Sequence, residues 1–192
     1  MKYVVFCGSG IGVHPEYKSE AIALGKEMAR RNIGVVYGGA KIGIMGAVAD
    51  GAMQNGGEVI GVIPHFLNAK EIAHDAITEM IPVDTMHERK ALMNQLSDGM
   101  ITLPGGIGTM EEFFEVLTWG QLGLHKKPIA ILNTLGYYDG LIELLTTMVE
   151  KGFLKSTHRD MIIVANDITT LLDKMSNYQA PPTEQWITEE RV

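Results

Sequence analysis

Short apolar runs alternate with amphipathic stretches along the chain, and this alternation constrains the fold more than any other feature. Strand-like runs occur at 2–8, 33–39, 58–64, 99–105, 127–133 and 161–166, with a further apolar segment at 77–83. Helical patterns occur at 16–31, 43–57, 85–97, from Thr109 onward, at 138–151 and in a short stretch after 166. Apolar strands separated by helices are typical of a mostly parallel sheet covered on both faces. We therefore expect an α/β protein: a single Rossmann-like domain over 1–176 and a surface-draped or loosely ordered polar tail at 177–192.

The composition fits one globular domain in a reducing compartment. The chain has 192 residues, of which 46% are hydrophobic, enough for a sizeable core. No apolar run reaches the length of a membrane span, and Met1-Lys2 leads directly into a strand-like run rather than a signal peptide. The single cysteine, Cys7, excludes an internal disulfide framework. We expect a cytoplasmic protein without a membrane partner.

The charge balance limits the ligands. Sixteen basic residues stand against 23 acidic ones, giving a net charge of −7, which disfavours duplex nucleic acid as a partner. The six histidines show none of the spacings that hold metal ions, so we expect no metal site. A small anion in a locally positive pocket is compatible with this composition.

Three strand-like runs end in glycine-rich turns, at 7–12, 37–46 and 103–109. The carboxyl ends of parallel strands meet at one edge of the sheet, where ligands bind, so these turns together predict a phosphate or nucleotide site. A dinucleotide fingerprint is incomplete, because Val13 replaces its third glycine and the second strand ends in Tyr37-Gly38 without a carboxylate. A Walker A loop is absent from the sequence. A mononucleotide or a sugar phosphate fits best.

Glu112 allows two interpretations. Thr109 and Glu112 have the spacing of a capping box, in which each side chain satisfies an amide at the start of a helix. Alternatively, Glu112 lies at the border of the apolar helix face, beside Val116 and Trp119, where its carboxylate reaches a partly desolvated cleft. Helical spacing alone does not decide between them.

Arg89 shares one helical face with Met86, Met93 and Leu96. An arginine on an apolar face either forms a structural ion pair or serves as a fixed cation for a phosphate or carboxylate. Both interpretations remain open at this point.

The motifs "MHERK" (86–90) and "PGGIGTMEE" (104–112) together resemble the paired motif of the Lonely Guy family, the cytokinin-activating phosphoribohydrolases once labelled lysine decarboxylase-like. The resemblance extends from "CGSG" through "YGGAKIGIMG", "GVIP" and "EVLTWGQLGLHKKP" to "GYYDGL". Two positions depart from the family pattern: Gly10 stands where a second serine is common, and Ala40 where a third glycine is common. Both bear on base preference rather than on the chemistry.

The resemblance implies hydrolysis of the N-glycosidic bond of a nucleoside 5′-monophosphate, without a cofactor, by a homodimer. Arg89 and Glu112 would be the catalytic pair, with Arg89 serving either the phosphate or the departing base. Apolar or aromatic residues such as Trp119, Leu122 and Leu124 lie in a stretch that could supply the dimer interface. The implied substrate-binding residues are Ser9, Gly38, Gly39, Glu71, Lys90, Gly105, Gly106, Ile107, Gly108, Thr109, Met110, Glu111 and Thr118.

Two other functions compete with this one. A pyridoxal-phosphate decarboxylase needs a Schiff-base lysine, and neither Lys41 nor Lys90 stands in a recognisable cofactor setting. A non-catalytic nucleotide- or molybdenum-cofactor-binding protein would share the P-G-G-x-G-T loop. Arg89-Lys90 together with Glu112 favours the enzyme. The sequence does not distinguish adenine from isopentenylated adenine or a broader range of bases.

Overall fold

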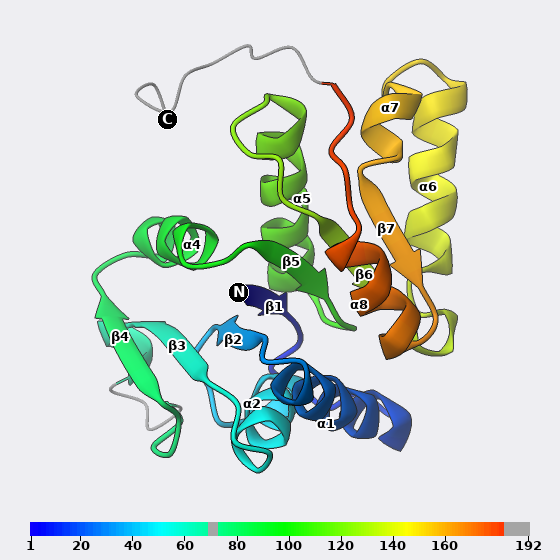
Figure 1. Cartoon of the computed structure of the whole chain (residues 1–192). Coiled ribbons are helices and arrows are strands. Elements are labelled where there is room, and N and C mark those ends of the chain that lie inside the picture. Colours follow the sequence, from blue (N-terminus) through cyan, green and yellow to red (C-terminus); the bar gives the residue numbers. More distant parts are fainter. Residues whose placement is uncertain (69–72, 183–192) are drawn as a thin grey trace.

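The computed structural model describes residues 1–68 and 73–182, and its centre is one sheet of seven parallel strands (Figure 1). The spatial order is β4-β3-β2-β1-β5-β6-β7. The strands are β1 (Lys2–Phe6), β2 (Gly34–Tyr37), β3 (Val59–Pro64), β4 (Glu79–Val83), β5 (Gly99–Thr102), β6 (Ile129–Leu132) and β7 (Ile162–Ala165). The expected Rossmann-like α/β fold is confirmed.

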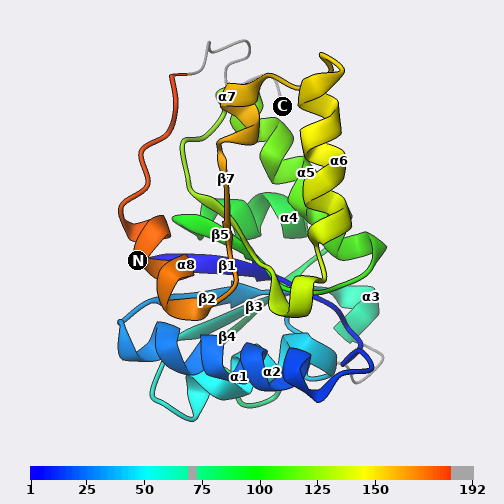
Figure 2. The ribbon, with the colours of Figure 1, turned by 90° about the vertical axis from the view of Figure 1, so that its right-hand side faces the viewer.

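Helices cover both faces of the sheet (Figure 2). One face carries α1 (Pro15–Arg30), α2 (Gly43–Met53) and α8 (Ile168–Ser176). The other carries α4 (Met86–Gln95), α5 (Ile107–Gln121) and α6 (Asp139–Glu150). Two helices of four residues each, α3 (His65–Asn68) and α7 (Ser156–Arg159), and a 3-10 turn at Thr134–Gly136 complete the described elements.

The strands are apolar on both sides because each side of the sheet has its own core. Along β1, Tyr3 and Val5 face the core under α1 and α2, whereas Val4 and Phe6 face the core under α5. This alternation is the two-residue period of a strand, and here both sides are buried. Strand β1 therefore contributes side chains to both cores.

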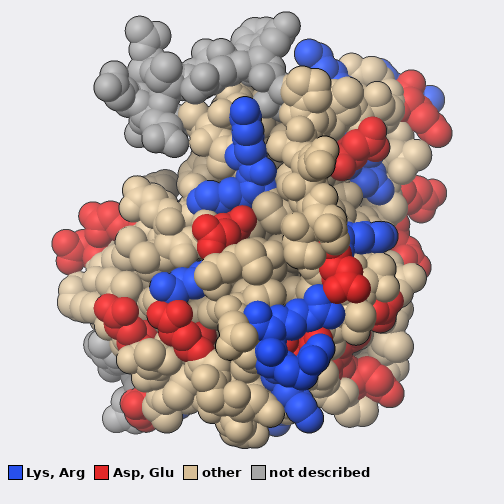
Figure 3. All heavy atoms as spheres, in the orientation of Figure 1, with Lys and Arg blue, Asp and Glu red and all other residues tan. Residues whose placement is uncertain are grey.

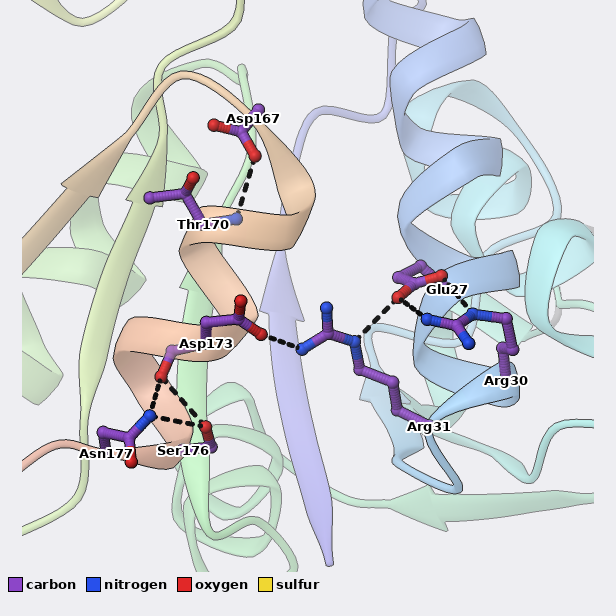
Figure 4. Close-up of polar contacts among 8 residues, drawn as sticks. All are labelled: Glu27, Arg30, Arg31, Asp167, Thr170, Asp173, Ser176 and Asn177. Atoms are coloured by element: carbon purple, nitrogen blue, oxygen red, sulfur yellow. Dashed lines mark hydrogen bonds and ion pairs between the residues drawn. The ribbon is translucent and has the colours of Figure 1, made fainter.

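An exposed ion-pair network joins α1 to α8 (Figure 4). Glu27 accepts hydrogen bonds at 2.7 Å from Arg30 and Arg31, and these bonds lower the pKa of Glu27 to about 2. Arg31 also donates to Asp173 on α8 at 2.5 Å. Because Arg30 and Asp173 are exposed and Glu27 and Arg31 are partly so, we expect the network to orient α8 more than to stabilise the fold.

The observed boundaries depart from the predicted ones at two places that matter for the site. The strand expected at 99–105 ends at Thr102, and the helix expected from Thr109 begins at Ile107. The expected tail at 177–192 follows α8, but its residues 183–192 lie outside the described residues, so the domain boundary stays a prediction. Within 1–68 and 73–182, no helix is long and apolar enough to cross a bilayer.

Candidate active site

The path of the chain through the sheet creates a place for a ligand between β1 and β5. Strands β1 to β4 are laid down in one direction, and the chain then returns to place β5 on the other side of β1, paired in parallel with it. In open α/β sheets, ligands bind beyond the carboxyl ends of the strands at this reversal. A cleft of about 290 Å³ opens there, lined by the end of β1, by α4 and by the start of α5.

The three glycine-rich turns meet at this cleft, as expected. The amide of Gly8 donates to the carbonyl of Pro104 at 3.1 Å, and the amide of Ile44 donates to the carbonyl of Gly8 at 3.1 Å. A side chain at Gly43 would place its Cβ 2.1 Å from the Ser9 carbonyl oxygen, so the backbones approach as closely as glycine allows. The turns form one continuous wall.

The start of α5 presents free amides to the cleft. The first hydrogen bond of the helix runs from the amide of Met110 to the carbonyl of Gly106, at 3.1 Å. The amides from Gly106 to Thr109 precede it and have no acceptor within the helix. Gly106, Ile107 and Gly108 are exposed, and all three line the cleft with Thr109. Amides in this arrangement, at the positive end of a helix dipole, favour an anion.

The capping-box interpretation of Glu112 is wrong. Gly106, in an extended conformation, occupies the N-cap position, and no side chain caps the helix. Thr109 is therefore the third residue of α5 and Glu112 the sixth, a full turn too far along to reach the end amides. The N-cap therefore lies three residues earlier than the Thr109 signal indicates, at a glycine of the turn.

Glu112 lies in the cleft wall with a perturbed carboxyl group. Burial raises its pKa from an ordinary 4.5 to about 7, and the charge of Arg89 opposes this rise. Within the described chain, no hydrogen bond or ion pair engages the carboxylate of Glu112. A partly buried carboxyl with a near-neutral pKa, facing a cleft and unengaged by the protein, is typical of an acid–base group.

Helix α4 delivers Arg89 to the same cleft. Its start is capped: the Thr85 hydroxyl accepts from the amide of Glu88 at 3.1 Å, and the Glu88 carboxylate accepts from the amide of Asp84 at 2.9 Å. Arg89 follows one residue later, with its side chain only 8% exposed. These two hydrogen bonds stabilise the first turn of α4, from which the Arg89 side chain extends.

The guanidinium of Arg89 has no acidic partner among the described residues. Its Nε is buried without a hydrogen-bond acceptor, and its Nη1 has only the sulfur of Met86 at 3.9 Å. The structural ion-pair interpretation is therefore not supported by the described chain. A buried cation left unpaired is costly, so the cleft favours an anionic ligand.

Lys90, the neighbour of Arg89, lies in a different environment. Its ammonium group pairs with Glu111 and, at 3.0 Å, with Glu115, both on α5. Burial lowers the pKa of Lys90, but the hydrogen bonds to Glu111 and Glu115 outweigh this and leave the pKa above its ordinary value. Lys90 thus joins α4 to α5 behind the cleft and is not part of the cleft wall.

The structure brings most, but not all, of the predicted site residues together. Those in the cleft wall are Ser9, Gly38, Arg89, Gly106, Ile107, Gly108, Thr109, Glu111 and Glu112. Gly105 lines a neighbouring cavity of about 310 Å³ that shares Gly8, Ser9 and Gly106 with the cleft. Lys90, Gly39, Met110 and Thr118 lie outside both walls, and Glu71 lies outside the described residues.

Several wall residues were missed as site residues by the sequence analysis. Cys7 directly follows β1, and burial raises the pKa of its thiol, so it contributes a neutral surface. Met45, Met86 and Met93 supply the apolar part of the wall. The placement of Met86 and Met93 on the helical face of Arg89 was the available signal for two of them, whereas Met45 carried none.

Solved structures of similar fold have unrelated ligands. A molybdenum cofactor binding protein from Rippkaea orientalis matches with a TM-score of 0.69 and 20% identity, over 92% of this chain and 95% of that one. DNA processing protein A from Helicobacter pylori, described for its single-stranded DNA binding mode, matches with a TM-score of 0.58 and 20% identity, over 93% and 82%. Likeness at this level shows the fold alone.

The sequence comparisons are more specific. The family described as "possible lysine decarboxylase" matches residues 45–175. A cytokinin riboside 5′-monophosphate phosphoribohydrolase of Arabidopsis thaliana is 46% identical over 91% of this chain and 82% of its own length. A probable enzyme of the same name from Oryza sativa subsp. japonica is 45% identical over 91% and 77%. With both motifs in one cleft and this similarity over most of its length, the chain belongs to the Lonely Guy family of cytokinin riboside 5′-monophosphate phosphoribohydrolases.

Proposed function

We propose that this protein hydrolyses the N-glycosidic bond of a nucleoside 5′-monophosphate, releasing the free base and ribose 5-phosphate. The observation that carries the proposal is the placement of Glu112, Arg89 and the free amides of α5 around one cleft. The activity for which the relatives are named, phosphoribohydrolysis of cytokinin riboside 5′-monophosphates, points to the same reaction. Water adds to the anomeric carbon, and the base departs with a proton.

The start of α5 is the proposed site of the 5′-phosphate. The amides from Gly106 to Thr109 supply donors, and the buried Thr109 side chain and Ser9 stand in the same wall. Hydrogen bonds from neutral donors to a charged phosphate are among the stronger ones in proteins. They would hold the substrate at one end and leave the ribose to extend toward Glu112.

Glu112 is the proposed catalytic carboxylate. Breaking a glycosidic bond builds positive charge on the sugar ring, as it does in glycosidases. A carboxylate beside that carbon stabilises the charge and can accept a proton from the attacking water. Since burial holds the pKa of Glu112 near 7, the group can exchange a proton at neutral pH.

Arg89 is the proposed catalytic cation. Its buried, unpaired guanidinium can bind either the phosphate or the departing base. In either role its positive charge stabilises negative charge on the group that it binds. We further propose, from the family resemblance, that Gly38, Gly39, Glu71, Gly105, Met110, Glu111 and Thr118 contribute to substrate binding. Lys90 would contribute through Glu111, with which it pairs.

We propose that the protein is a cytoplasmic homodimer that does not bind nucleic acid. The proposal rests on the family resemblance and on the net charge of −7. On the face shown in Figure 3, acidic and basic side chains are mixed, apart from one group of basic side chains low in the centre. Trp119, Leu122 and Leu124, at the far end of α5, are partly exposed and available for an interface. Light scattering at micromolar concentration should give twice the chain mass; the mass of one chain would contradict the dimer.

A panel of nucleotides tests the reaction. The purified protein is incubated with AMP, GMP, CMP, isopentenyladenosine 5′-monophosphate and adenosine, and the products are followed by mass spectrometry. We expect equimolar free base and ribose 5-phosphate from at least one monophosphate. Adenosine should react more than about a hundredfold more slowly than AMP, because it lacks the phosphate that the α5 amides hold. Release of no free base from any nucleotide would overturn the proposal.

A further inference from the structure

Two consecutive tyrosines in the connection between β6 and α6 hold the turn that leads into α5. The hydroxyl of Tyr138 donates to the carbonyl of Leu103 at 2.7 Å. The hydroxyl of Tyr137 donates to the carbonyl of Gly105 at 2.6 Å. These carbonyls stand on either side of Pro104, in the turn that separates β5 from the free amides of α5.

Each of the three carbonyls in this turn accepts a hydrogen bond from another segment of the chain. The last sheet bond of this segment runs from the amide of Leu103 to the carbonyl of Phe6, at 2.9 Å. Beyond it, the Leu103 carbonyl is held by Tyr138, the Pro104 carbonyl by the amide of Gly8 at 3.1 Å, and the Gly105 carbonyl by Tyr137. Beyond the last sheet bond, two tyrosine side chains and one backbone amide thus orient the turn.

The peptide between Gly105 and Gly106 depends most on such a contact. Two glycines flank it, so no side chain restricts its rotation. In a trans peptide the carbonyl oxygen and the following N–H point in opposite directions. The hydrogen bond from Tyr137 to the Gly105 oxygen therefore also sets the direction of the Gly106 N–H, on the side away from the tyrosine.

The tyrosines are themselves held in place. The Asn133 side chain accepts from the amide of Tyr138 at 2.8 Å, and it donates to Asp139 at 2.7 Å. Tyr138 is buried, and burial raises its pKa, so its hydroxyl stays protonated as a donor. The ring of Tyr137 is 46% exposed but packs edge-on against Tyr138 and against Tyr17, at 4.8 and 5.8 Å between ring centroids.

We propose that Tyr137 is a positioning residue for the 5′-phosphate: its hydroxyl holds the Gly105–Gly106 peptide so that the Gly106 N–H joins the phosphate-binding amides of α5. Tyr138 supports it by fixing the preceding carbonyl. Neither tyrosine needs to touch the substrate. The inference deepens the proposed function and rests on the phosphate site assigned there.

Removal of one hydroxyl tests the inference. Tyr137→Phe keeps the ring and its packing but loses the donor to Gly105; Tyr178→Phe, at a tyrosine beyond α8 and outside the cleft wall, is the matched control. We expect Tyr137→Phe to lower kcat/KM for AMP by about tenfold or more, the effect of weakening one bond to a charged group. The slow rate of adenosine cleavage and the melting temperature of Tyr137→Phe should equal those of the wild type. Tyr178→Phe should match the wild type in every one of these measurements.

A phosphate titration gives a readout that does not require turnover. The amide resonances of Gly106 to Thr109 are followed by NMR as inorganic phosphate is added. We expect the wild type to show saturable shifts and Tyr137→Phe to show a Kd at least about tenfold weaker. An unchanged Kd together with an unchanged ratio of AMP to adenosine turnover overturns the inference.

The two measurements separate failure of this inference from failure of the proposed function. If the wild type cleaves AMP and prefers it to adenosine, the proposed function holds. The Tyr137→Phe result then tests only the positioning role of Tyr137. If the wild type cleaves no nucleotide, the proposed function fails. The phosphate titration still shows whether Tyr137 organises an anion site, because it does not require turnover. Equal losses for AMP and adenosine would also contradict the positioning role.

Discussion

The guanidinium of Arg89 lies directly over the α-carbon of Gly38, so close that a Cβ at position 38 would sit 1.8 Å from Nη2. Gly38 follows β2, whereas Arg89 is carried by α4. The second glycine-rich turn therefore leaves room for the cation of the cleft, in addition to any contact it makes with a ligand.

Gly38→Ala should displace Arg89 while leaving the fold intact. The added methyl group meets the end of a flexible side chain, and the sulfur of Met45 at 3.1 Å, rather than backbone. We expect kcat/KM for AMP to fall by roughly tenfold or more, and unfolding to be easier by about 1–3 kcal/mol at most, the usual cost of overpacking.

Gly140→Ala is the matched control, because a Cβ at Gly140 has no heavy atom within 4 Å. Its activity should equal that of the wild type. Wild-type kcat/KM in a folded Gly38→Ala protein would show that the position of Arg89 against Gly38 does not matter for the reaction.

Replacement of Lys90 should act through the two carboxylates that it pairs with. In Lys90→Met, Glu111 and Glu115 lose their cation, and their charges then oppose ionisation of Glu112 more strongly. We expect a loss of about 1–3 kcal/mol in stability and an upward shift of the acidic limb of the pH profile of kcat/KM. Urea unfolding and rates measured from pH 5 to 9 check both effects.

Lys90→Arg separates this role from direct contact with the substrate. The arginine keeps the positive charge and can pair with both carboxylates, so most of the stability and the original pH profile should return. A Lys90→Met protein with an unchanged pH profile would contradict the electrostatic link to Glu112.

The fold was largely predictable from the sequence, because the strands other than the edge strand β4 are apolar on both faces and each glycine-rich turn follows a strand. The start of α5 was not, because Thr109 has the appearance of an N-cap while Gly106 takes that position. The helices α3 and α7 were not predicted, because four residues are too few to show the hydrophobic periodicity of a helix. The pairing of Lys90 with Glu111 and Glu115 depends on the packing of α4 against α5, which spacing along the chain does not reveal.

Glu112 should destabilise the folded protein above neutral pH. Its pKa is about 7 in the folded state and near 4.5 when exposed, so the unfolded chain loses this proton first as the pH rises. The higher pKa in the folded state means that protonation of Glu112 favours folding. This contribution to stability is complete below pH 4.5 and disappears as the pH passes 7. We expect Glu112→Gln to be more stable than the wild type at pH 8 by about 1–3 kcal/mol, after allowance for the cleft's access to solvent.

Urea unfolding of both proteins at pH 4 and pH 8 checks this difference, which should shrink toward pH 4. Glu143→Gln is the control, because Glu143 is exposed on α6. A Glu112→Gln protein that is less stable than the wild type at pH 8 would mean that the carboxylate has a stabilising partner.

Chelation should leave the activity unchanged. Across residues 1–68 and 73–182, no group of three or more histidine, cysteine, aspartate or glutamate side chains is arranged to hold a metal ion. We expect equal rates of AMP cleavage with and without EDTA. A loss of activity that a divalent ion restores would require a metal in the mechanism.

The catalytic role of Glu112 is the central claim, and the rate of ribose 5-phosphate release from AMP by Glu112→Gln tests it most directly. The amide keeps the shape of the side chain and removes its charge and basicity. At pH 8, with the variant shown to be folded and to bind ribose 5-phosphate, we expect kcat to fall by roughly 10²–10⁴-fold, the range for a removed acid–base group. A folded Glu112→Gln protein that releases ribose 5-phosphate at nearly the wild-type rate would contradict the account.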